Sequence, residues 1–167
     1  MEFPEIEYGS RVAVEAALDK IRQAMDLDGD RARKIVEIAL GIKETYTDLE
    51  PYFRRFIEPF CAKCATPCCV NRHGYPDFED LIFFNATGRQ MNDFDFSCND
   101  TDACQYLGDS GCILSRCVRS YRCTWYFCDE VLDAFKSRDD KAFKKFEYLT
   151  KRLASQRMTL IREFEFL

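Results

Sequence analysis

The chain has 167 residues, of which 47% are hydrophobic and 32% charged, and its net charge is −5 at pH 7. The hydrophobic share supports a folded core and excludes intrinsic disorder, while the acidic balance argues against nucleic acid as a partner. No run approaches the roughly 18 apolar residues of a membrane span, so no membrane partner is expected.

The chain starts with an acidic segment, residues 1–7. This segment lacks both the basic and the apolar region of a secretory signal. We therefore expect a soluble protein of the cytoplasm, where thiols are kept reduced.

Helical patterns dominate the first 60 residues. Apolar residues recur at spacings of three and four over 10–27 and again over 31–47, which predicts two amphipathic helices. The residues 28–30, Asp-Gly-Asp, end the first helix and offer an N-cap to the second. Thr47 and Glu50 have capping-box spacing and Pro51 fits a first turn, which predicts a third helix that runs to Glu58.

The last part of the chain is also helical by pattern. Apolar residues at helical spacing over 141–164 predict a long helix, whose charged residues we expect to face solvent. No repeat or linker divides the sequence. We therefore predict a mostly α single domain over 1–167, with helical flanks at 1–60 and 129–167 and a cysteine-rich, loop-dominated metal-binding centre at 61–128.

All ten cysteines lie within 61–128. A disulfide scaffold compensates for a core that is too small, and this chain has ample apolar material. Inert cysteines are normally scattered through a core. Clustered, reduced cysteines instead indicate metal binding.

The first cysteine block is C-x2-C-x3-C-C. It consists of Cys61, Cys64, Cys68 and Cys69, with Pro67 stiffening the loop. Two residues between cysteines let one turn aim both thiolates at one metal ion or cluster. Adjacent side chains in an extended segment point to opposite faces, so Cys68 and Cys69 are expected to serve different ligation tasks.

The second block is C-x7-C-x10-C-x4-C. Gly108 and Gly111 permit the turn that brings its cysteines to a common centre. These cysteines are Cys104, Cys112, Cys123 and Cys128.

Aromatic and basic residues accompany the second block. The run 125–127, Trp-Tyr-Phe, is expected to wall the site off from water. Arg116, Arg119 and Arg122 suit thiolates as charged donors, and ordinary surface charge is an equally good interpretation.

The two blocks together resemble the YkgJ-type cysteine-cluster family, whose members are described as zinc- or iron-chelating domains. The resemblance covers 61–128 and implies that Cys61, Cys64, Cys68, Cys69, Cys104, Cys112, Cys123 and Cys128 are metal ligands. Relatives commonly carry Arg-Pro before the third cysteine of the second block, where this chain has Arg119-Ser120. Cys98 and Cys117 lie outside the pattern and are expected to be bystanders.

Other ligand types are scarce or poorly spaced. His73 is the single histidine, which excludes Cys2His2 zinc sites, and we expect a loop or packing role for it. The acidic residues of 77–102 lack calcium-loop spacing and are expected to form a solvated loop. They are Asp77, Glu79, Asp80, Asp93, Asp95, Asp100 and Asp102.

All-thiolate ligation suits both iron–sulfur clusters and zinc. The aromatic enclosure and the arginines favour an iron–sulfur cluster, of [4Fe–4S] type, in a redox or metal-handling accessory protein with an unidentified protein partner. The alternative is a zinc-stabilised protein-interaction module without redox activity. No catalytic residue set is recognised, so an enzymatic role is not expected.

Overall fold

A computed structural model describes residue 6 and residues 10–65, 67–70, 74–89, 94–99, 101–109 and 111–165. The described part is mostly helical, as predicted, with a single two-stranded sheet. The elements in chain order are α1 (Arg11–Leu27), α2 (Gly29–Tyr52), the π-helix η1 (Phe53–Ile57), α3 (Glu58–Cys61), the 3-10 helix η2 (Cys68–Val70), α4 (Phe78–Ala86), β1 (Leu107–Gly108), β2 (Gly111–Cys112), the 3-10 helix η3 (Arg116–Val118), α5 (Arg122–Trp125), α6 (Asp129–Arg138) and α7 (Asp140–Glu165). No helix in this described part is both long and apolar enough to cross a membrane.

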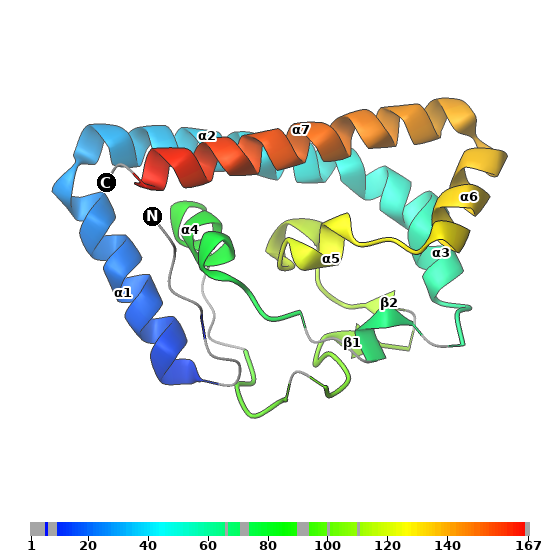
Figure 1. Cartoon of the computed structure of the whole chain (residues 1–167), viewed down its shortest axis with the longest axis horizontal. Helices are drawn as coiled ribbons and strands as arrows, with labels where there is room; N and C mark the ends of the chain where they lie inside the picture. Colours follow the sequence, from blue (N-terminus) through cyan, green and yellow to red (C-terminus); the bar gives the residue numbers. More distant parts are fainter. Residues whose placement is uncertain are drawn as a thin grey trace.

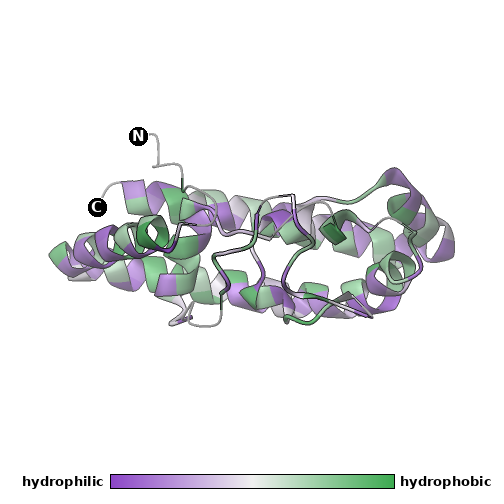
Figure 2. Cartoon of the chain, turned by 90° about the horizontal axis from the view of Figure 1, so that it is seen from below, coloured by the Kyte–Doolittle hydropathy of each residue, from purple (hydrophilic) through white to green (hydrophobic). Residues whose placement is uncertain are grey.

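The two longest helices, α2 and α7, run side by side in opposite directions and form the frame of the molecule (Figure 1). The Thr45 hydroxyl donates to Gln156 Oε1 at 2.7 Å, and Lys34 pairs with Glu163 at 2.8 Å. Helices α1 and α4 pack at one end of this frame, while α3, α6 and the cysteine-bearing loops lie toward the other end (Figure 1). Each helix carries both hydrophilic and hydrophobic residues, as expected when one face of a helix packs on a core (Figure 2).

The first helix and its end agree with the sequence pattern. Ser10 caps α1, since its hydroxyl accepts from the Ala13 N–H at 3.2 Å. Asp28 then accepts from the N–H groups of Asp30 and Arg31 and so caps α2. Asp28 therefore separates the two helices as predicted.

The predicted helix start at Thr47 is wrong, because α2 continues through that residue to Tyr52. The Thr47 hydroxyl donates to the Lys43 carbonyl at 3.1 Å, so it bonds back to the preceding turn and caps nothing. Pro51 lies inside the helix, where it cannot donate a backbone hydrogen bond, and the π-helix η1 follows directly. Helices α2, η1 and α3 thus form one continuous helical rod, which changes from α-helix to π-helix at η1 and ends at Cys61.

The aromatic residues before the first cysteine belong to the core, as their spacing predicted. Phe53 and Phe56 are buried in η1. The Phe56 ring stacks on Phe135 of α6 with centroids 4.0 Å apart, and Phe53 meets Phe146 of α7 edge-on at 5.6 Å. This aromatic cluster fixes the end of the rod against α6 and α7.

The acidic stretch 77–102 is not the predicted solvated loop over its first ten residues. Asp77 and Asp80 form a capping box that opens α4, a helix whose apolar residues are nearly all buried. Asp80 is itself buried, and its Oδ1 accepts from Arg157 of α7 at 2.7 Å and from the Tyr121 N–H at 3.0 Å. The burial of the apolar residues of α4 decided the structure of this segment. The prediction failed because it considered only the acidic residues of the stretch. Asp93 and Asp100 lie outside the described residues.

The buried Asp80–Arg157 pair gives a first prediction. Arg157→Leu removes the positive partner and leaves Asp80 buried with no counter-charge, so we expect a loss of about 3–5 kcal/mol in the free energy of unfolding. Urea denaturation followed by circular dichroism measures it. The control is Arg152→Leu on the same helix, where a 3.9 Å surface pair with Asp48 is removed at a cost below about 1 kcal/mol. Equal losses in the two variants would contradict the assignment.

Candidate metal centre

The first cysteine block follows the end of the rod. Cys61 ends α3, and the Cys64 N–H donates to the Cys61 carbonyl at 3.1 Å, which closes a turn between the two residues. Cys68 and Cys69 lie in the 3-10 helix η2 and not in the extended segment expected from the sequence. Adjacent side chains in a 3-10 helix still diverge by about 120°, since three residues make one turn. The two side chains therefore point in different directions, as expected, but because of the 3-10 helix and not because of an extended segment.

The second block folds back onto the first. The Cys104 N–H donates to the Cys69 carbonyl at 2.8 Å, which joins the two blocks directly. Cys112 lies in the hairpin of β1 and β2, whose turn uses Gly111 at φ +110°, as the glycines predicted. Cys123 lies in α5, and Cys128 is the residue that precedes α6.

A cavity of about 580 Å³ lies between these segments. All eight cysteines of the two blocks line it: Cys61, Cys64, Cys68, Cys69, Cys104, Cys112, Cys123 and Cys128. Cys98 and Cys117 do not line it. The Cys98 thiol lies near Asp95, with 3.8 Å between its Sγ and the carboxylate, and Cys117 lies 3.7 Å from the Ser115 hydroxyl. The fold thus separates the pattern cysteines from the other two.

Within the cavity, four of the eight thiols form one neighbourhood, which we call the outer quartet: Cys61, Cys64, Cys68 and Cys128. Burial raises the pKa of the Cys61 thiol, and Cys128, Cys68 and Cys64 raise it further. The pKa of Cys128 is also raised by burial, by Glu130 and, less strongly, by Cys68. Cys61, Cys64 and Cys68 are exposed, so this neighbourhood lies at the surface.

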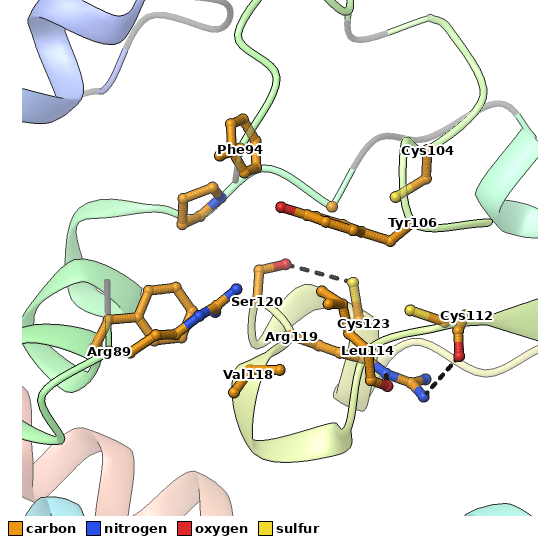
Figure 3. A pocket seen from close by; sticks show the side chains of 13 residues that line it. Arg89, Phe94, Cys104, Tyr106, Cys112, Leu114, Val118, Arg119, Ser120 and Cys123 are labelled. Carbon is orange, nitrogen blue, oxygen red and sulfur yellow. Dashed lines mark hydrogen bonds between the residues drawn. The ribbon is translucent and has the colours of Figure 1, made fainter. Parts of the chain in front are cut away.

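The other four thiols form the inner quartet: Cys69, Cys104, Cys112 and Cys123. Burial raises the pKa of Cys69 to about 11, and Cys123, Cys104 and Cys112 contribute next. A Cβ at Gly74 would lie 3.1 Å from the Cys123 sulfur and 3.7 Å from the Cys104 sulfur, so both sulfurs face that glycine. Figure 3 shows Cys104, Cys112 and Cys123 gathered at one end of a smaller pocket that opens beside them.

Two arginines are buried between the cysteine segments, which excludes the interpretation of ordinary surface charge. Arg116 donates to Glu58 at 3.3 Å and to the Cys123 carbonyl at 2.9 Å. Arg119 donates to the same Glu58 oxygen at 3.2 Å and to the Leu114 carbonyl at 2.8 Å. One carboxylate thus joins the end of the rod to the second cysteine block.

Arg116 lines the cavity and acts on one thiol of each quartet. Its guanidinium lies 3.5 Å above the Phe53 ring, and burial together with the nearby Arg119 lowers its pKa to about 10. It is an electrostatic neighbour of both Cys61 and Cys123, and it lowers the pKa of each. Its Nε is buried and has no hydrogen-bond partner within the part of the chain that the structure describes. A buried donor of this kind suits a thiolate or a sulfide beside it.

The predicted aromatic wall is only partly present. Phe127 lines the cavity and also packs on Phe53 and Phe146, so it forms part of the predicted wall. Trp125 and Tyr126 line the cavity too but are 56% and 45% exposed, so they leave it open to solvent.

As the side chains stand, no three Cys, His, Asp or Glu residues of the described part lie close enough to hold a metal ion. The thiols surround the cavity without converging. Metal sites of this kind commonly complete their folding on ligation. His73 lies outside the described residues.

Two residues of the site were missed in the sequence. Glu58 carries no motif, although its position one turn before Cys61 on an apolar helix offered a weak signal. Gly74 had no signal, because its closeness to two sulfurs depends on how the blocks fold together.

Comparison of the chain with protein-family models, with curated proteins and with solved structures found no significant match.

The shared carboxylate gives a second prediction. Glu58→Ala removes the acceptor of two buried guanidinium groups, so we expect a loss of about 1–3 kcal/mol in stability. We also expect faster amide hydrogen exchange over 111–123 than in the unmodified protein. The control, Glu15→Ala, removes a 3.9 Å surface pair with Arg11 and leaves this exchange unchanged. Unchanged exchange in both variants would show that Glu58 does not hold the second block.

Proposed function

We propose that the chain binds a thiolate-ligated iron–sulfur cluster of [4Fe–4S] type and acts as a redox or metal-handling accessory protein of the reducing cytoplasm. The observation that carries the proposal is the cavity lined by all eight pattern cysteines and by neither of the other two. These thiols come from α3 and the turn after it, from η2, from the loop before β1, from β2, from α5 and from the residue before α6. Segments that are distant in the sequence therefore gather one complete cysteine pattern around one space.

The chemistry of the lining favours a cluster over a single ion. Thiolate sulfur is the usual ligand of iron–sulfur clusters, and a structural zinc site is a closed tetrahedron that leaves no adjoining space. A cavity of about 580 Å³ is far larger than one zinc ion needs. The alternative occupant of this cavity is zinc, which would make the protein a zinc-stabilised interaction module.

The protein's own residues determine how such a group behaves. A cluster supplies one-electron redox chemistry, and its potential depends on net charge, on hydrogen bonds to sulfur and on solvent exposure. Arg116 and Arg119 bring two positive charges into the interior. Both stabilise the more negative, reduced state. The exposed edge at Trp125 and Tyr126 leaves one side open, on which a protein that exchanges electrons or metal with the site can approach.

This proposal also takes up the resemblance to the YkgJ-type family, whose members are described as zinc- or iron-chelating domains. The eight thiols that line the cavity, the two buried arginines and the exposed edge at Trp125 and Tyr126 support the accessory role.

The elemental composition of the purified protein tests the proposal. Protein purified without oxygen should be brown and should contain iron and acid-labile sulfide in comparable amounts, because the cluster contains both. Colorimetric iron and sulfide assays with metal analysis measure this. Colourless protein that holds stoichiometric zinc and no sulfide would replace the proposal with the zinc alternative.

Single substitutions test which cysteines are ligands. Cys64→Ser and Cys123→Ser should each lose about half of the bound metal or more, because each removes a thiolate from the lining. Cys98→Ser and Cys117→Ser are the matched controls and should retain all of it. Metal loss in the two controls, with retention in the first two variants, would disprove the assignment.

A further inference from the structure

The eight cysteines divide into two sets of four. In the inner quartet (Cys69, Cys104, Cys112, Cys123), the Cys104 N–H donates to the Cys69 carbonyl, the Cys104 and Cys123 sulfurs both face Gly74, and Cys104, Cys112 and Cys123 line one small pocket. In the outer quartet (Cys61, Cys64, Cys68, Cys128), one turn joins Cys61 to Cys64, and the thiols that act electrostatically on Cys61 are Cys128, Cys68 and Cys64. The chain passes from one quartet to the other twice, at the peptide bond between Cys68 and Cys69 and between Cys123 and Cys128.

Four ligands are the number that one tetrahedral ion or one [4Fe–4S] cluster requires. The 3-10 geometry of η2 turns Cys68 and Cys69 about 120° apart, so one centre cannot readily use both. The cavity reaches both quartets and is not confined to one.

Resting on the proposed thiolate–metal function, we propose that the protein holds two separate metal centres, one on each quartet, joined through the Cys68–Cys69 peptide. The first centre uses the outer quartet and the second uses the inner quartet. The doublet at 68–69 is then the shortest possible covalent link between two centres.

A site with two negatively charged centres requires a positive charge near both, and Arg116 provides one. Four thiolates around a [4Fe–4S]²⁺ core or around Zn²⁺ leave a net charge of −2, so two centres repel each other across a poorly solvated interior. Arg116 is buried and is a charge neighbour of Cys61 in one quartet and of Cys123 in the other. Its unpartnered Nε is a further donor there. A cation in this position reduces the repulsion between the centres.

The two centres differ in their access to solvent. Three thiols of the outer quartet are exposed. In the inner quartet Cys104 is buried, the other three are half-buried, and the buried Ser120 hydroxyl lies 3.4 Å from the Cys123 sulfur. The outer centre is therefore the one that meets a chelator, an oxidant or a partner first, and the inner centre is protected.

Substitution of the two adjacent cysteines tests the division. Anaerobically purified Cys68→Ser and Cys69→Ser are compared with Cys64→Ser, from the outer quartet, and with Cys112→Ser, from the inner. Iron and sulfide per chain are measured, together with the electron paramagnetic resonance spectrum after reduction with dithionite. Cys98→Ser is the control, and circular dichroism verifies that the helices are intact.

We expect about eight irons in the unmodified chain and about half as many in each ligand variant. Cys68→Ser and Cys64→Ser should give the same spectrum, because both variants keep only the inner centre. Cys69→Ser and Cys112→Ser should share a second, different spectrum, because both keep only the outer centre. The control should keep all the iron and the spectrum of the unmodified protein. If Cys68→Ser and Cys69→Ser give the same spectrum, or if either loses all its metal with its helices intact, the two-centre division is wrong.

The unmodified chain provides a second measurement, independent of whether any variant folds. Removal of metal by a chelator should proceed in two phases of about equal amplitude, with the outer centre emptied first. A single phase with intact helices would overturn the division.

The same experiments separate this inference from the proposed function. Two zinc ions per chain, of which each ligand variant loses one, would refute the iron–sulfur proposal and support the division. About four irons that each of the four ligand substitutions removes would support the iron–sulfur proposal and refute the division.

Discussion

One carboxylate, that of Glu58, carries the connection on which the site depends. It lies at the start of α3, the last helix of the rod formed by α2, η1 and α3, and accepts from two buried guanidinium groups, those of Arg116 and Arg119. These arginines also hold the carbonyls of Cys123 and Leu114. The carboxylate thereby fixes the second cysteine block against the end of the rod, which carries the first. Without it, two positive charges would remain buried with one acceptor fewer.

Helix α4 provides the other half of this arrangement. It interrupts the cysteine-rich region in sequence, yet it packs into the core and anchors the region to α7 through Asp80 and Arg157. The Tyr121 N–H also donates to Asp80, so the same buried carboxylate positions the start of α5. The cysteine loops are therefore held from two sides, by Glu58 at one end and by Asp80 at the other. These two anchors explain how mostly irregular loops present eight thiols to one cavity.

Much of this could be predicted from periodicity and spacing. The helices 10–27 and 141–164 and the Asp28 cap follow local rules that need no knowledge of the fold. The distinction of Cys98 and Cys117 from the other eight cysteines rested on the family resemblance. The prediction failed where a long-range contact decided the outcome. Thr47 bonds back to Lys43 within a helix stabilised by α7, and the acidic stretch at Asp77 became a helix because its apolar residues are buried. The action of Arg116 on one thiol of each quartet likewise depends on tertiary packing.

The central claim is that these thiolates ligate the iron of an iron–sulfur cluster. X-ray absorption at the iron edge of anaerobically purified protein tests it most directly, because scattering from neighbouring atoms identifies the ligands without reference to any substitution. The account predicts a first shell of sulfur alone and a second shell of iron. A first shell of nitrogen or oxygen, or an absorption edge of zinc in place of iron, would contradict it.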